Sequence, residues 1–348
     1  MKMSKMKFSL PFLIVIALFS ACTPEDEKAS GAYSNGVFIV NEGPFTGGTG
    51  SVDFYDRQKT VTNDIYAKAN NGAKIGSILQ SMIVFENKAY LMVNNANKIT
   101  IVDPNTFIST GEATGITYPN YMVPIDKNAA YVSEWGKDGK NGAVKVYDVV
   151  LKSFAKTIPI KKLGAGKMIA VGQTLFVVND SGLSFPAQDS TITLVNIATG
   201  TDTILRTIKV DESPNSIVQD ANGEIWVLCS KSLNKIKNNA VEFSIKVPDY
   251  SSKLTTDISK NNLYFVNGNK VYQKDLLNFG KNTPSVFLTQ PYLVSPYAIG
   301  FDPKSGLMYC GDAKNFSSAG KVYIFDPSSK VLKDSLTVGI APNGFVFQ

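Results

Sequence analysis

Short apolar runs recur along the chain, each with an aromatic residue, or once methionine, in second place. These second residues lie 38 to 52 positions apart and are Phe38, Tyr90, Tyr131, Phe176, Trp226, Tyr264 and Met308. A second run of six residues follows each one and ends on Asp56, Asp103, Asp148, Asn196, Lys237, Asp275 or Asp326. A third, more variable run and then a fourth complete each unit. Runs of this length with β-branched and aromatic residues predict β-strands.

The aspartates that end the second runs could be read as metal ligands or catalytic acids. Each of them, however, precedes turn residues such as Pro104 and Asn105. Asp and Asn side chains accept hydrogen bonds from their own backbone in turns, so we expect these residues to make turns. Only the fifth unit, which carries Lys237, departs from the pattern.

Four short strands per unit of about 45 residues, with turns between them and no amphipathic helix pattern, predict an all-β fold, a seven-bladed β-propeller. The phrase "APNGFVFQ" at 341–348 resembles "YPNYMVPID", "SPNSIVQD" and "SPYAIGFD", which open other units. The first unit begins on its second strand, "VFIVN". We therefore expect the C-terminal strand to complete the first blade and close the ring, within a propeller domain at 34–348.

The N-terminus has the pattern of a lipoprotein signal peptide at 1–21. Three lysines precede an apolar run at 8–19, and "SAC" ends at Cys22, the predicted lipidation site. Phe19 departs from the usual leucine, and an ordinary signal peptide is the alternative. Residues 22–33 are polar and predict a flexible acidic tether. The acidic run at 25–27 resembles the export signal of surface lipoproteins of the outer membrane, whereas a plain linker would leave the domain in the periplasm.

The net charge and the cysteine content limit which functions the chain can have. Removal of residues 1–21 takes three lysines and no acids from the 35 basic and 29 acidic residues, which leaves a net charge of +3. A nearly neutral domain without a basic stripe gives no indication of nucleic-acid binding. Cys229 and Cys310 lie in strand-like runs of different units; we expect buried thiols, although a disulfide stays open.

The alternation "PN.I..D..G" and "LYV.N....I.V.D" resembles that of YncE-like seven-bladed propellers over essentially the whole mature chain. Residues 41–107 are similar to a surface-lipoprotein branch that includes the BtuG-like cobalamin-binding propellers. The resemblance implies a surface-anchored binding protein, without enzymatic activity, that passes a small molecule to a TonB-dependent outer-membrane transporter. It does not specify cobalamin, because ligand choice depends on the loops.

The chain contains no histidine. This excludes Ser-His-Asp and Cys-His nucleophilic sites, histidine general bases and imidazole-bound metals in this chain. "DANGE" at 220–224 and "KDGKNG" at 137–142 lack the oxygen ligands of a calcium loop and predict hairpin turns. "GPFTGGTG" at 43–50 has no Lys-Ser/Thr and predicts a loop between strands. We expect no catalytic residue, no metal and no cofactor.

In a propeller, the loops after the second strands and those entering the first strands lie on one face. We take this face as the candidate ligand site, because its amides and aromatics suit a bulky polar ligand with flat apolar surfaces. The first group of loops contributes Asn41, Glu42, Asn94, Asn95, Glu134, Trp135, Asn179, Asp180, Asn267 and Asp312. The second contributes Gln80, Tyr118, Asn120, Tyr121, Lys167, Asn215, Thr255, Tyr297 and Asn343.

Any one of these residues could instead make a contact between blades. Trp135 stands out because it lies in a polar loop.

The leading hypothesis is capture of a small molecule, with a corrinoid as first candidate. The alternatives are a structural or adhesive propeller that binds another protein, and a hydrolase that uses a carboxylate pair among Glu42, Glu134, Asp180 and Asp312.

Overall fold

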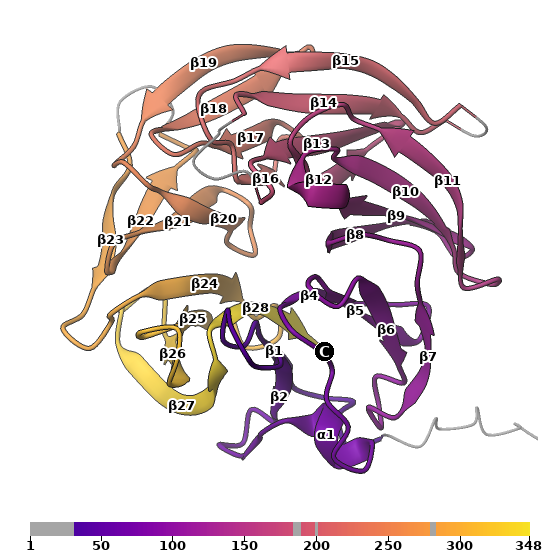
Figure 1. The fold of residues 1–348 in the computed structure, drawn as a ribbon. Coiled ribbons are helices and arrows are strands. Elements are labelled where there is room, and N and C mark those ends of the chain that lie inside the picture. The colour runs from indigo at the N-terminus through magenta and orange to yellow at the C-terminus, as the bar shows by residue number, and fades with distance from the viewer. Residues whose placement is uncertain (1–30, 184–188, 199–200, 279–282) are drawn as a thin grey trace, which may run out of the picture. The chain divides into compact units, whose positions relative to one another are not determined.

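Each unit of the sequence pattern forms one four-stranded antiparallel sheet, or blade, and seven blades stand in a ring (Figure 1). The computed structural model describes residues 31–183, 189–198, 201–278 and 283–348. The predicted signal peptide, Cys22 and nearly all of the tether lie outside these residues. The predicted seven-bladed propeller is confirmed.

The inner strands, which surround the ring axis, are in blade order β28 (Pro342–Phe347), β4 (Leu79–Phe85), β8 (Pro119–Asp126), β12 (Gly164–Val171), β16 (Ser216–Gln219), β20 (Ser252–Thr256) and β24 (Pro296–Phe301). The second strands are β1 (Val37–Asn41), β5 (Lys88–Val93), β9 (Ala129–Glu134), β13 (Thr174–Asp180), β17 (Ile225–Leu228), β21 (Asn262–Asn267) and β25 (Met308–Asp312).

The third strands are β2 (Ser51–Tyr55), β6 (Lys98–Val102), β10 (Ala143–Asp148), β14 (Thr191–Asn196), β18 (Ser232–Lys237), β22 (Lys270–Asp275) and β26 (Ala319–Phe325). The outer strands are β3 (Val61–Thr62), β7 (Ser109–Ala113), β11 (Ser153–Pro159), β15 (Thr203–Lys209), β19 (Ala240–Lys246), β23 (Ser285–Thr289) and β27 (Leu332–Ile340).

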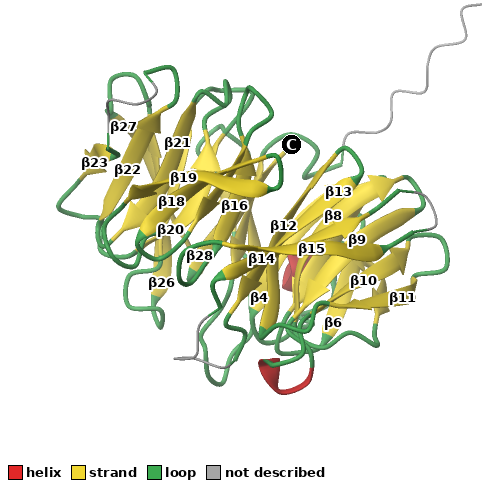
Figure 2. Ribbon diagram, turned by 90° about the horizontal axis from the view of Figure 1, so that it is seen from above, coloured by secondary structure: helices red, strands yellow, loops and turns green. Residues whose placement is uncertain are grey.

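In the described residues, helical structure is confined to short segments of connections, and strands and loops form the rest of the ring (Figure 2). The helix α1 (Ile65–Ala69) follows the outer strand of blade one (Figure 1), and the Asp64 side chain caps it by accepting a hydrogen bond from the Ala67 backbone N–H. A single 3₁₀ turn, η1 (Lys137–Gly139), lies between β9 and β10. Among the described residues, no helix has the length and apolar character needed to cross a bilayer.

The two ends of the repeat meet in blade one, as expected. The C-terminal strand β28 pairs antiparallel with β1, so that Phe38 lies opposite Val346 and Ile39 opposite Phe345. Arg57 adds a bidentate ion pair to Asp302 of blade seven, with Nε–Oδ2 and Nη2–Oδ1 distances of 2.7 and 2.9 Å. The inner strands then contact one another around the whole ring. Closure removes the open sheet edges of an incomplete blade.

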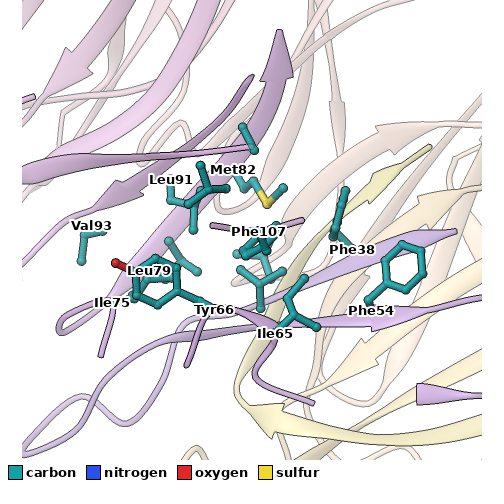
Figure 3. Close-up of a cluster of buried hydrophobic side chains, with 14 residues drawn as sticks. Phe38, Phe54, Ile65, Tyr66, Ile75, Leu79, Met82, Leu91, Val93 and Phe107 are labelled. Atoms are coloured by element: carbon teal, nitrogen blue, oxygen red, sulfur yellow. The ribbon is translucent and has the colours of Figure 1, made fainter. Parts of the chain in front are cut away.

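The hydrophobic core is divided into seven clusters, one between each pair of neighbouring blades. Figure 3 shows the cluster between blades one and two. Within it, the ring centres of Phe38 of blade one and Phe107 of blade two are 5.4 Å apart. The aromatic second residues of the repeat are buried in these clusters. Their periodic recurrence therefore reflects a repeated packing role between blades.

The aspartates that end the third strands make turns, as predicted. Asp103 Oδ1 accepts the backbone N–H groups of Asn105 and Thr106 at 2.7 and 3.2 Å. The equivalent bonds recur at Asp56, Asp148, Asn196, Asp275 and Asp326.

The two cysteines of the propeller are buried and unpaired, also as expected. Burial, as the largest cause, raises the pKa of each thiol to about 12. These thiols therefore act as small apolar side chains.

Candidate functional site

A cavity of about 400 Å³ lies among the inner strands and receives residues from all seven blades. Seven residues of the candidate face line it: Gln80, Tyr121, Lys167, Asp180, Asn215, Thr255 and Asn343. The rest of the wall is formed by Val40, Ser81, Met82, Ser216, Ser252, Lys253, Leu254, Ala298, Ile299, Gly344, Phe345 and Val346. Cavities of this size are typical of small-molecule sites.

Bulges at the start of the inner strands place several of these side chains. In β8, β12 and β20, three residue steps along the inner strand lie opposite only two steps along the second strand. Tyr121, Lys167 and Lys253 lie within these irregular stretches. In each of these blades the aromatic second residue of the repeat pairs with one residue of the inner strand. Tyr121, Lys167 and Lys253 each lie two positions before that paired residue. A bulge turns the local backbone and re-aims its side chains, which here meet at the ring axis.

Two lysines carry positive charge into this cavity. Lys167 Nζ donates to the Leu254 carbonyl at 3.3 Å, and Lys253 Nζ lies 3.9 Å from the centre of the Tyr297 ring. Burial, followed by the charge of Lys253, lowers the pKa of Lys167 to about 8. Burial also lowers the pKa of Lys253, against the attraction of Glu42.

Asp180 supplies a carboxylate at the end of β13. Its Oδ2 accepts from Trp135 Nε1 at 3.1 Å and its Oδ1 from the Gly182 N–H at 3.0 Å. Burial raises the pKa of Asp180 to about 6 against these bonds. Gly164 and Gly166 make room for it, because a Cβ at either position would lie 2.2 or 2.5 Å from a carboxylate oxygen.

Two tyrosines and Glu42 form the edge of the site. Burial raises the pKa of Tyr297 well above its usual range, with the nearby Glu42 carboxylate as the next cause. Burial likewise raises the pKa of Tyr121, although a hydrogen bond with Gln80 opposes the change. Both phenols are therefore neutral hydrogen-bonding groups near neutral pH.

Four of the nine predicted amides connect neighbouring blades through their side chains. Asn343 of blade one donates to the Leu79 and Gln80 carbonyls of blade two at 3.2 and 3.1 Å. Asn120 of blade three donates to the Ala165 carbonyl of blade four at 2.9 Å. Asn215 of blade five makes the equivalent bond to the Ser251 carbonyl, just before blade six, at 3.0 Å. Asn94 of blade two donates to the Pro119 carbonyl and to the side-chain oxygen of Asn120, both of blade three.

Other predicted residues lie outside the cavity wall. Glu134 accepts the Thr117 N–H at 2.8 Å, and Asp312 accepts the Val294 and Ser295 N–H groups at 2.9 and 2.8 Å. Asn41, Asn179 and Asn267 bond within their own blades or entry loops, while Asn95 is exposed. The cavity thus contains one carboxylate of the four considered for a hydrolase.

Trp135 does not line the cavity either. Its ring packs near Tyr118, with 6.2 Å between centres, and its N–H holds Asp180. Its contribution to the site is therefore the positioning of a carboxylate.

For blade six, Thr255 was predicted from the sequence and Lys253 was missed. Thr255 does line the cavity, but Lys253 is the residue equivalent to Tyr121 and Lys167. The sequence "DYSSKLTT" lacks the Pro-Asn pair that marks this position in other blades. Aligning inner strands through their aromatic partners would have found Lys253.

The polar loops "DANGE" and "KDGKNG" form local turns. Asp220 of "DANGE" closes the turn between β16 and β17 by accepting the Asn222 and Glu224 N–H groups, both at 2.9 Å. "KDGKNG" contains the 3₁₀ turn η1 rather than the simple hairpin we predicted, because the connection is longer than a tight turn. Within the described ranges, no three histidine, cysteine or carboxylate side chains gather as metal ligands would.

Solved structures with the same ring share little sequence with this chain. The periplasmic gluconolactonase of Pseudomonas aeruginosa is 12% identical, with a TM-score of 0.65, over 89% of this chain and 99% of that one. A quinonprotein alcohol dehydrogenase-like protein of Bacteroides thetaiotaomicron is 16% identical, with a TM-score of 0.65, over 90% and 78%. Hydrazine synthase of Kuenenia stuttgartiensis is 16% identical, with a TM-score of 0.62, over 78% and 91%. Such low identity establishes the fold alone.

No curated protein sequence matches the chain closely enough to count as a relative. A family model does match, and it spans residues 35–347, which is the whole ring from the second strand of blade one to the closing strand. The chain therefore belongs to the family described as domain of unknown function DUF5074.

Proposed function

We propose that this protein is a lipid-anchored binding protein that captures a polar small molecule in the central cavity. The observation that carries the proposal is the convergence of polar side chains from separate blades, among them Gln80, Tyr121, Lys167 and Lys253, on one cavity. Polar groups placed within a mostly preformed cavity are typical of ligand sites.

The sequence supports the rest of the proposal. The "SAC" boundary at Cys22 and the acidic run at 25–27 favour display on the outer membrane. The resemblance to surface-lipoprotein propellers favours delivery to a TonB-dependent transporter. If the domain is displayed outside the cell, protease added to intact cells will digest it; digestion only after lysis would place it in the periplasm.

A corrinoid is the first ligand to test, because residues 41–107 resemble the cobalamin-binding branch. A whole corrinoid is bulkier than a cavity of about 400 Å³, so its ring would cover the mouth while a substituent enters. Several aromatic contacts of about 0.5–1.5 kcal/mol each beyond burial would support such a pose.

Calorimetric titration of the purified full-length protein with cyanocobalamin tests this ligand. We expect binding that weakens in Tyr121→Ala and persists in Leu151→Ala, since Leu151 lies in an exposed turn at the other end of blade three. Absence of heat with cyanocobalamin would remove the corrinoid. Absence of binding across a panel of polar metabolites would favour the protein-binding propeller instead.

One observation favours a second candidate, a hydrolase: Asp180 has a pKa of about 6 in the cavity, which suits a general base near neutral pH. The gluconolactonase of similar fold suggests glucono-1,5-lactone as the substrate to try. Acid release above the buffer rate that is lost in Asp180→Asn would make the protein an enzyme. Acid release no faster than in buffer would leave binding as the function, and an unchanged rate in the variant would show that Asp180 is not the base.

A further inference from the structure

Lys167 and Lys253 occupy equivalent positions of blades four and six and line the same cavity. Neither takes part in an ion pair within 4.0 Å among the residues that the structure describes. Lys167 instead donates to a backbone carbonyl, and Lys253 lies over the Tyr297 ring. Two lysine side chains thus face one cavity without a direct counterion.

This arrangement is unfavourable, because burial penalises each charge and the two ammonium groups repel each other. Asp180 lines the same cavity, but among the described residues its carboxylate makes no ion pair within 4.0 Å with either lysine, and it accepts hydrogen bonds from Trp135 Nε1 and the Gly182 N–H. An anion between the two lysines would offset the repulsion and accept charge-assisted hydrogen bonds from both ammonium groups.

We infer that the cavity binds an oxyanion, a carboxylate or phosphate group of the captured molecule, between Lys167 and Lys253. The neutral part of that molecule then faces the amide and hydroxyl groups of Gln80, Asn215 and Thr255. This inference rests on the proposed binding function and deepens it by naming the chemical class of the ligand.

The first test uses inorganic phosphate and succinate as probes at pH 7, in calorimetric titration of the full-length protein. We expect both anions to bind, and Lys167→Met or Lys253→Met to weaken binding by tenfold or more. Lys209→Met changes an exposed lysine of the outer strand β15 and should bind as the unmodified protein does. Lys167→Arg keeps the charge and should retain most of the affinity. Thermal melts confirm that each variant is folded.

The second test follows sulfate binding between pH 7 and 9, where sulfate keeps its charge. Lys167 loses its proton near pH 8, so affinity should fall several-fold in the unmodified protein and less in Lys167→Arg. The other titratable groups that line the cavity are Lys253, Asp180 and Tyr121, and Tyr297 and Glu42 lie next to them. Burial lowers the pKa of Lys253 and raises those of both tyrosines, so Lys253 adds to the fall and the phenols stay neutral.

The two proposals fail in different ways. Phosphate binding that is equally strong in the Lys167→Met, Lys253→Met double variant would overturn the anion site, as would no binding of phosphate, sulfate or succinate. Cyanocobalamin could still bind in either case, and the proposed capture function would stand. Lysine-dependent anion binding without cyanocobalamin binding would uphold the anion site and remove only the corrinoid.

Discussion

At the residue scale, Lys167 lowers the stability of the fold that holds it. Its pKa is about 8 in the folded chain against an ordinary value of 10.5. Between these values the unfolded chain binds more protons, so the contribution of Lys167 to stability rises as the pH increases from 8 to 10.5. Below pH 8 the lysine is charged in both states, and its burial opposes folding. A residue that is kept at such a cost is more readily explained by binding than by packing.

We expect Lys167→Met to raise the free energy of unfolding at pH 7 by about 1–3 kcal/mol, with solvent in the cavity keeping the gain toward the lower value. The gain should shrink toward pH 10. Guanidinium denaturation at both pH values measures it, with Lys209→Met expected within about 0.5 kcal/mol of the unmodified protein. Equal stability of Lys167→Met and the unmodified protein at pH 7 would contradict this account.

At the scale of elements, asparagine side chains connect neighbouring inner strands. Asn343, Asn120 and Asn215 each carry a hydrogen bond from one blade to the next. They take the place of the backbone ladder, which stops at the edge of each sheet. The inner strands β8 and β12 carry the bulges that direct Tyr121 and Lys167 inward. Amide bonds thus hold the frame, while the bulged residues face the ligand.

Asn120→Ala should lower the free energy of unfolding by about 1–3 kcal/mol, because it removes the buried hydrogen bonds that Asn120 makes with the Ala165 carbonyl and the Asn94 amide. Asn95→Ala removes an exposed amide of the neighbouring blade and should change stability by less than about 0.5 kcal/mol. Chemical denaturation of the two variants gives the comparison. If both lose the same amount, the bond between blades three and four contributes no special stability.

At the scale of the whole molecule, the ring is closed by β28 and by the ion pair between Arg57 and Asp302. Each blade buries its two faces against its neighbours, so an opening in blade one exposes the clusters on both of its sides. The cavity at the centre needs all seven inner strands to keep its shape.

Deletion of 343–348 removes nearly all of β28 and should lower the free energy of unfolding by at least about 3 kcal/mol. The midpoint of thermal unfolding should fall by at least about 6 °C. Leu151→Ala, at an exposed turn, is the control and should melt as the unmodified protein does. A truncated protein that melts within a degree or two of the full chain would show that the paired strand does not stabilise the ring.

The sequence by itself determined the blades, their order and the closing strand. Strands and turns depend on neighbours within a few residues, and the burial of residues such as Tyr90 and Tyr264 repeats in every blade, so both leave a periodic signal. The turn role of Asp103 and its equivalents is local in the same way.

Only the tertiary structure decided which polar residues share the cavity. Asn120, Asn215 and Tyr297 each follow a proline in the sequence. The two asparagines nevertheless donate hydrogen bonds toward the next blade, whereas the Tyr297 ring lies under the ammonium group of Lys253. Lys253 was missed and Trp135 was placed at the ligand, because a bulge in β20 and a contact between neighbouring blades set these roles. Lys167 and Lys253 are 86 positions apart and line the same cavity, and no pattern along the chain encodes their proximity.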